Sequence, residues 1–123
     1  MKDIENRQDL EMLLGEFYNR LLKDPVIGYV FTDVAKINIE EHLPVITDFW
    51  EQVLFHTRTY KNNPMQIHQA LNEKEKLTAE HFDAWLSHFT ETTDSYFSGP
   101  NAEKIKTRAL SIATIIKIKV SAH

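Results

Sequence analysis

The sequence predicts one all-α domain, and three observations support this. Apolar residues recur at the i, i+3, i+4, i+7 spacing of a helix face along nearly the whole chain. Prolines and a Gly-Pro pair stand where these periodic segments end or begin. The length of 123 residues suits a single core that buries roughly two thirds of the unfolded surface. Without an internal repeat, low-complexity tract or linker, residues 1–123 are expected to form a single domain.

The first expected helix ends at Asp24-Pro25, because the residue before a proline is pushed out of the α region. Residues 26–31 then form a short apolar segment, which we interpret as a turn or short helix at a corner. The inward face of the first helix consists of Leu10, Leu13, Leu14, Phe17, Tyr18, Leu21 and Leu22.

A second long helix is expected from about Ile39 to Leu54. Its acidic opening, Glu40-Glu41, suits the positive end of a helix dipole, and Pro44 is expected near the first turn. Two apolar stripes run along it, so it should be covered on more than one side. One stripe holds His42, Ile46, Phe49 and Val53, and the other holds Leu43, Trp50 and Leu54.

Three more helices are expected after a polar loop over residues 57–63. Asn63-Pro64 predicts the start of a short helix over residues 65–71. Thr78 should cap the next helix, with Leu77 and Phe82 at the spacing of a hydrophobic staple. Gly99-Pro100 stops that helix, and Asn101 is expected to cap the last one. The apolar face of the last helix is Ala102, Ile105, Ala109, Ile112, Ala113, Ile116 and Val120.

Composition excludes several classes of protein. The absence of cysteine removes disulfides, thiolate nucleophiles and iron–sulfur clusters, and three glycines supply no dinucleotide or phosphate-binding motif. A net charge of −4 argues against nucleic acid as a partner. No apolar stretch approaches the ~20 residues of a membrane span, and the polar start is unlike a signal peptide. We therefore expect a cytoplasmic protein without membrane contact.

Two histidines have apolar neighbours on their expected helices, His42 on the second long helix and His68 on the short one. Such a residue is more often a hydrogen-bonded core histidine than a ligand. Against this reading, Tyr18, Phe31 and Trp85 also lie on expected inward faces. Imidazole, phenol and indole groups converging on one cavity are typical of the few polar groups that orient a ligand in an apolar pocket.

At these residues the sequence resembles the truncated haemoglobins, specifically their group III. The first two groups have Gly-Gly pairs at their corners, and this chain has none. The resemblance covers nearly the whole chain in a fixed order of motifs. These are Phe17-Tyr18, Phe31, His42-Leu43-Pro44, Asp48-Phe49-Trp50, Tyr60, Asn63-Pro64-Met65, His68, residues 81–86, Asp94, Phe97, Gly99, Arg108-Ala109 and Ile112-Ala113.

The resemblance implies a truncated globin fold whose helices sandwich a haem, expected to be haem b. His68 would be the proximal iron ligand, since haem iron needs one strong axial nitrogen. Tyr18, His42 and Trp85 would line the distal side, with Tyr18 and Trp85 as donors to the ligand and His42 as a gate at the mouth. The other expected haem contacts are Phe31, Ile46, Phe49 and Phe82.

The remaining histidines are expected to be structural or exposed. His81 and His88 share a helix face without a suitably spaced glutamate, so both are interpreted as half-exposed residues. His81 is nevertheless a competing proximal ligand, and His56 and His123 are expected at the surface. In the polar loop, Arg58 and Tyr60 are candidates to contact haem propionates, and a solvated arginine is an equal alternative.

The expected function is reversible binding of dioxygen, nitric oxide or carbon monoxide by a monomer or weak homodimer. A nitric oxide dioxygenase or peroxidase-like activity is a further alternative, and it would need a separate reductase. The alternative from another class is a helical protein–protein interaction module without haem. A di-iron bundle is disfavoured, because no Glu-x-x-His motif occurs.

Overall fold

The computed structural model describes residues 1–34, 36–56 and 77–121, the last three of these by their backbone alone. The described elements are α1 (Arg7–Leu22), the short π-helix η1 (Val30–Val34), α2 (Ile39–Phe55), α4 (Ala79–Tyr96) and α5 (Pro100–Ser121). All of them are helical, which confirms the predicted fold class for this part of the chain. The short helix expected over residues 65–71 lies outside the described residues.

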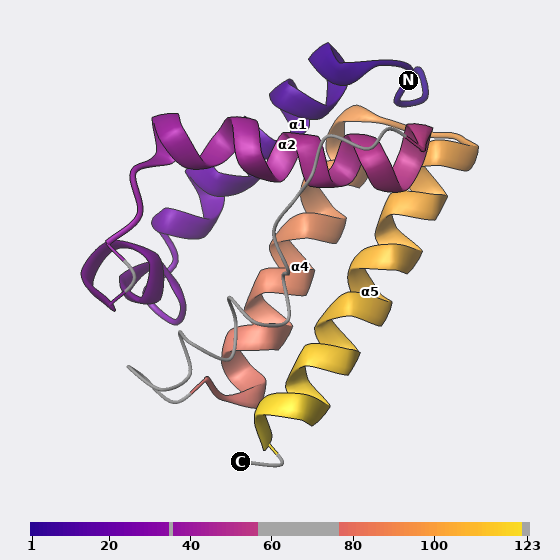
Figure 1. Cartoon of the computed structure of the whole chain (residues 1–123). Coiled ribbons are helices and arrows are strands. Elements are labelled where there is room, and N and C mark those ends of the chain that lie inside the picture. Colours follow the sequence, from indigo (N-terminus) through magenta and orange to yellow (C-terminus); the bar gives the residue numbers. More distant parts are fainter. Residues whose placement is uncertain (35, 57–76, 122–123) are drawn as a thin grey trace.

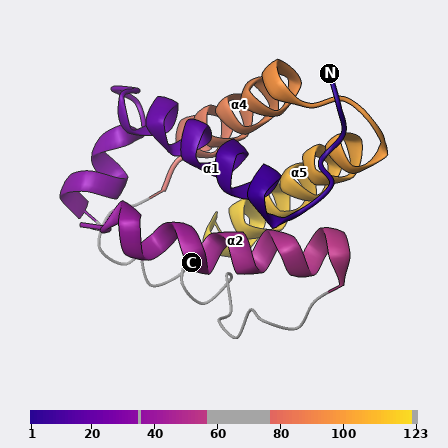
Figure 2. The ribbon, with the colours of Figure 1, turned by 90° about the horizontal axis from the view of Figure 1, so that it is seen from above.

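Helices α4 and α5 run side by side, and α2 crosses near their upper ends (Figure 1). Seen from above, α1 passes between α4 and α2 and contacts both (Figure 2). This arrangement makes α1 the centre of the core. Its predicted inward face is buried at Leu10, Leu13, Leu14, Phe17, Tyr18 and Leu21. None of the described helices is long and apolar enough to cross a membrane.

The corner after α1 agrees with the expected turn or short helix. A turn over residues 25–27 leads into η1, and Ile27 and Val30 are buried. Gly28 is needed there, because a Cβ atom would lie 2.5 Å from the carbonyl oxygen of Leu22. The corner can therefore fold back closely onto the end of α1, and this brings Phe31 towards the core.

The start of α4 follows the sequence prediction. Thr78 is the N-cap, and its hydroxyl accepts a hydrogen bond from the His81 N–H at 3.3 Å. Leu77 and Phe82, the predicted staple, pack in one small apolar cluster with Ile116. The entry angle of α4 is thus set by local sequence signals.

The start of α5 differs from the prediction that Asn101 is its N-cap. The helix begins at Pro100, and the Asp3 carboxylate accepts hydrogen bonds from the N–H groups of Asn101 and Ala102, both at 2.9 Å. The Asn101 side chain instead donates to the carbonyl of Ile4 at 2.7 Å. Asp3, which caps this helix, is almost one hundred residues away in the sequence, so a local motif could not predict the cap.

Helix α2 spans the predicted range, but Pro44 is not near its first turn. The helix begins at Ile39 with Asn38 as its N-cap, so Pro44 lies in the second turn. A proline there cannot donate to the carbonyl of Glu40, and one helical hydrogen bond is lost. Glu40 is exposed, so water can satisfy that carbonyl.

Candidate functional site

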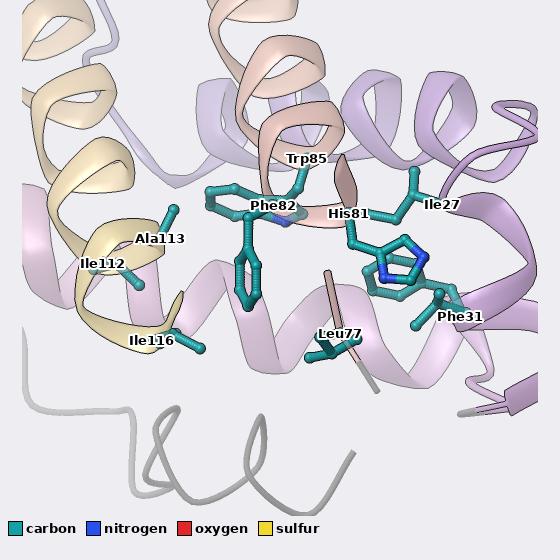
Figure 3. A pocket seen from close by; sticks show the side chains of 10 residues that line it. Ile27, Phe31, Leu77, His81, Phe82, Trp85, Ile112, Ala113 and Ile116 are labelled. Atoms are coloured by element: carbon teal, nitrogen blue, oxygen red, sulfur yellow. The ribbon is translucent and has the colours of Figure 1, made fainter. Parts of the chain in front are cut away.

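An apolar cavity of about 70 Å³ lies between the corner, α4 and α5, and it opens to solvent (Figure 3). This volume holds a few water-sized molecules. A larger flat ligand would therefore fill the mouth as well as the interior. The lining residues are Ile27, Val30, Phe31, Leu77, His81, Phe82, Trp85, Ile112, Ala113 and Ile116.

Phe31, Phe82 and Trp85, which the sequence predicted as ligand contacts, line this cavity together. Of the other lining residues, only His81 was considered from the sequence, as a competing iron ligand. Ile112, Ala113 and Ile116 were recognised only as the apolar face of the last helix. Periodicity shows which side of a helix is buried, but it does not distinguish core packing from the wall of a cavity.

Trp85 is held by two aromatic contacts. Its ring meets Phe17 edge-on at 5.7 Å between centroids and stacks on Phe89 at 5.4 Å. Figure 3 shows its indole at the cavity, which Trp85 lines. The indole is therefore held in place beside the cavity, with an N–H group that could donate to a ligand.

Tyr18 and His42 form a hydrogen-bonded pair beside the cavity. The Tyr18 hydroxyl oxygen lies 2.9 Å from Nε2 of His42, and their rings meet edge-on at 5.3 Å between centroids. Phe31 connects the pair to the cavity, since its ring centroid is 6.1 Å from that of Tyr18. Burial raises the pKa of Tyr18 well above its usual value, so the phenol stays protonated.

Ile46 and Phe49 lie on α2 and pack against the core without being fully buried. In the neighbouring stripe of α2, Trp50 and Leu54 are buried, with 2% and 5% of their surface exposed, and Leu43 is partly buried. Two apolar stripes are therefore present as predicted, but the stripe that carries His42 is the more open one. An apolar ligand could cover this face.

His81 is not half-exposed as predicted, because only 7% of it is accessible. Its Nδ1 accepts a hydrogen bond from the Thr78 N–H at 3.1 Å, and its Nε2 lies 3.0 Å from the Tyr29 hydroxyl oxygen. A histidine at this position replaces the usual glutamate or glutamine of a capping box. Both ring nitrogens are engaged, which makes His81 a poor candidate for an iron ligand.

His88 is half-buried as expected and donates to the Asp24 carboxylate at 2.6 Å. This hydrogen bond, with another from the Val26 N–H, lowers the pKa of Asp24. His56 is exposed, as expected, at the left-handed C-cap of α2. Within the described ranges, no three acidic or histidine side chains group as a metal site. Arg58, Tyr60, His68 and His123 lie outside the described residues.

Comparison with known proteins supports the fold and the sequence resemblance. No family model matches the chain. A group 3 truncated hemoglobin, ctb, of Campylobacter jejuni is 27% identical over 112 residues, which cover 89% of this chain and 86% of that protein. The crystal structure of a group III truncated hemoglobin from Campylobacter jejuni matches with a TM-score of 0.84. Its sequence identity is 24%, over 98% of this chain and 95% of the other. The predicted resemblance and the all-α truncated globin fold are confirmed.

Proposed function

We propose that this chain, which resembles the group III truncated haemoglobins in sequence and fold, is a haem protein that reversibly binds diatomic gases. The observation that carries the proposal is the apolar cavity together with the Tyr18–His42 pair, which contacts the lining residue Phe31. Apolar walls with a few aimed polar groups are typical of cofactor sites. In the truncated globin fold, this arrangement fits a haem with donors on one side.

The residues present fit a haem. Phe31, Phe82 and Trp85 offer flat aromatic and apolar surface to a macrocycle. Ile46 and Phe49 would extend that surface along the open stripe of α2. Because the chain has no cysteine, it cannot form the thioether links of a c-type haem, and this supports non-covalent haem b.

His68 is proposed as the axial ligand. The described histidines are less suitable, because His81 uses both ring nitrogens and His88 donates to Asp24. His56 is exposed at the end of α2. Arg58 and Tyr60 remain candidates for contacts with the propionates, as the sequence suggests.

A haem supplies an iron atom that binds dioxygen, nitric oxide or carbon monoxide. This chain supplies the environment of that gas ligand. Tyr18 stays neutral and can turn its hydroxyl from His42 to the ligand, and the Trp85 N–H is a second donor. A hydrogen bond to a charged acceptor is worth about 1.5–3 kcal/mol, so such donors would slow ligand escape.

Several donors at one site also suit nitric oxide detoxification or peroxide chemistry. Such an activity would need an external reductase, since the sequence contains no dinucleotide-binding motif. The simplest form of the proposal is a gas-binding protein acting in the cytoplasm as a monomer or weak homodimer.

The test is an absorption spectrum of the purified chain mixed with haem. The proposal expects a Soret band of ligated haem with one equivalent bound. His68→Ala should lose that spectrum and regain it with added imidazole, while the control His56→Ala should keep it. If the unaltered chain takes up no haem, the proposal fails, and the helical interaction module becomes the better interpretation. If His81→Ala loses the spectrum and His68→Ala keeps it, the ligand assignment is wrong.

A further inference from the structure

A second polar pair stands at the wall of the cavity, apart from Tyr18 and His42. His81 lines the cavity, and its Nε2 lies 3.0 Å from the hydroxyl oxygen of Tyr29 (Figure 3 shows the imidazole). The two rings meet at an interplanar angle of 64°, with 5.7 Å between centroids. His81 is buried, whereas Tyr29 is 37% exposed. The pair therefore joins a residue of the cavity wall to a partly exposed tyrosine that does not itself line the cavity.

The helix cap decides which way the hydrogen bond between them points. Nδ1 of His81 accepts the Thr78 N–H, so this nitrogen carries the lone pair in the neutral imidazole. The ring proton is then on Nε2, which donates it to the oxygen of Tyr29. Tyr29 is consequently an acceptor towards His81, and its own hydroxyl hydrogen is directed elsewhere.

The Tyr29 hydroxyl has no second partner within the described part of the chain. It is a hydrogen-bond donor held by a buried imidazole that lines the cavity, and the other described lining side chains are apolar apart from Trp85. A ligand with an apolar body and a charged edge would place the body inside and the edge in solvent. Tyr29 is partly exposed and is hydrogen-bonded to a residue of the cavity wall, so it is a candidate to contact that edge.

We propose that the Tyr29 hydroxyl, oriented by His81, binds a carboxylate of the ligand that fills the cavity. This inference rests on the proposed function, in which the carboxylate is a haem propionate. Tyr29 is then a binding residue and His81 a positioning residue. A carboxylate accepts only, which matches the donor that the tautomer of His81 leaves free.

The experiment uses two metal-free probes, protoporphyrin IX and its dimethyl ester, with binding followed by quenching of tryptophan fluorescence. Tyr29→Phe should weaken binding of the free acid by about tenfold, the loss of one charge-assisted hydrogen bond. Binding of the dimethyl ester should be unchanged. Tyr96→Phe is the matched control, because Tyr96 is similarly exposed (36%) and its hydroxyl donates to Glu16.

His81→Gln separates positioning from folding. Glutamine is a normal capping-box residue, so α4 should keep its start and its thermal stability. Its flexible amide holds Tyr29 less firmly, and we expect a smaller loss for the free acid with none for the ester. If Tyr29→Phe weakens both probes equally, or neither, the carboxylate contact is overturned. If the unaltered chain binds neither porphyrin, the proposed function itself fails.

Discussion

The Tyr18 hydroxyl and the His42 imidazole are joined by a hydrogen bond of 2.9 Å between their polar atoms. From the sequence, the two residues were predicted to have separate roles, Tyr18 as a donor to the ligand and His42 as a gate. Because of this hydrogen bond, an outward swing of His42 would break its contact with Tyr18 and leave the phenol able to donate to a ligand. The proposed gate and the proposed donor would then be coupled through this contact.

Tyr18→Phe should speed dioxygen dissociation by about tenfold or more. The ring shape is kept, so the loss reports one hydrogen bond to a ligand that carries negative charge. Stopped-flow displacement of dioxygen would measure the rate, with Tyr96→Phe as the control tyrosine remote from the cavity. Unchanged rates in both Tyr18→Phe and Trp85→Phe would remove the donor assignment.

His42→Ala should speed ligand association and reduce its dependence on pH. Without the imidazole the mouth stays open, and the side chain whose charge can change near neutral pH is removed. Dissociation should change less, because Tyr18 becomes free to donate to the ligand. Flash photolysis between about pH 5 and 8 would show this. Unaltered association together with much faster dissociation would instead make His42 a donor and refute the gate.

Asp24→Asn should destabilise the fold at neutral pH and not in acid. The pKa of Asp24 is lowered in the folded protein, chiefly by the hydrogen bond from His88. A carboxyl with a depressed pKa adds stability above its unfolded pKa of about 3.9, and this stability is lost as pH falls through the folded pKa.

Urea unfolding would measure the effect of Asp24→Asn at pH 6 and at pH 3. The loss at pH 6 should be up to about 1 kcal/mol, and it should shrink at the lower pH. The control is the same substitution at the exposed Asp33, Asp33→Asn. Equal losses for Asp24→Asn at both pH values would mean that packing, and not charge, accounts for its effect.

Asp3→Ala should lower the free energy of unfolding by about 1–2 kcal/mol, because it removes the cap of α5. Glu5→Ala, which affects an exposed contact with Lys2, should be close to neutral. Thermal unfolding followed by circular dichroism would compare them. A similar change in both variants would show that the Asp3 hydrogen bonds add no net stability.

The structure shows which of the residues predicted as haem contacts share a cavity, and their contact with a haem stays a prediction. Phe31, Phe82 and Trp85 all line that cavity. The burial of His81 could have been suspected from its position in the capping box after Thr78, but its hydrogen bond to Tyr29 could not. Tyr29 and His81 are 52 residues apart, and only folding brings them together.

The sequence alone determined the long helices that the structure describes, the inward face of α1 and the cap of α4, because periodicity and capping act over three or four residues. It also carried the resemblance to the truncated haemoglobins. Tertiary structure alone decided that Asp3 caps α5, that Tyr18 meets His42, and that Ile112 and Ile116 border a cavity. These relationships join distant segments, so they depend on how the helices pack, and no local pattern encodes that packing.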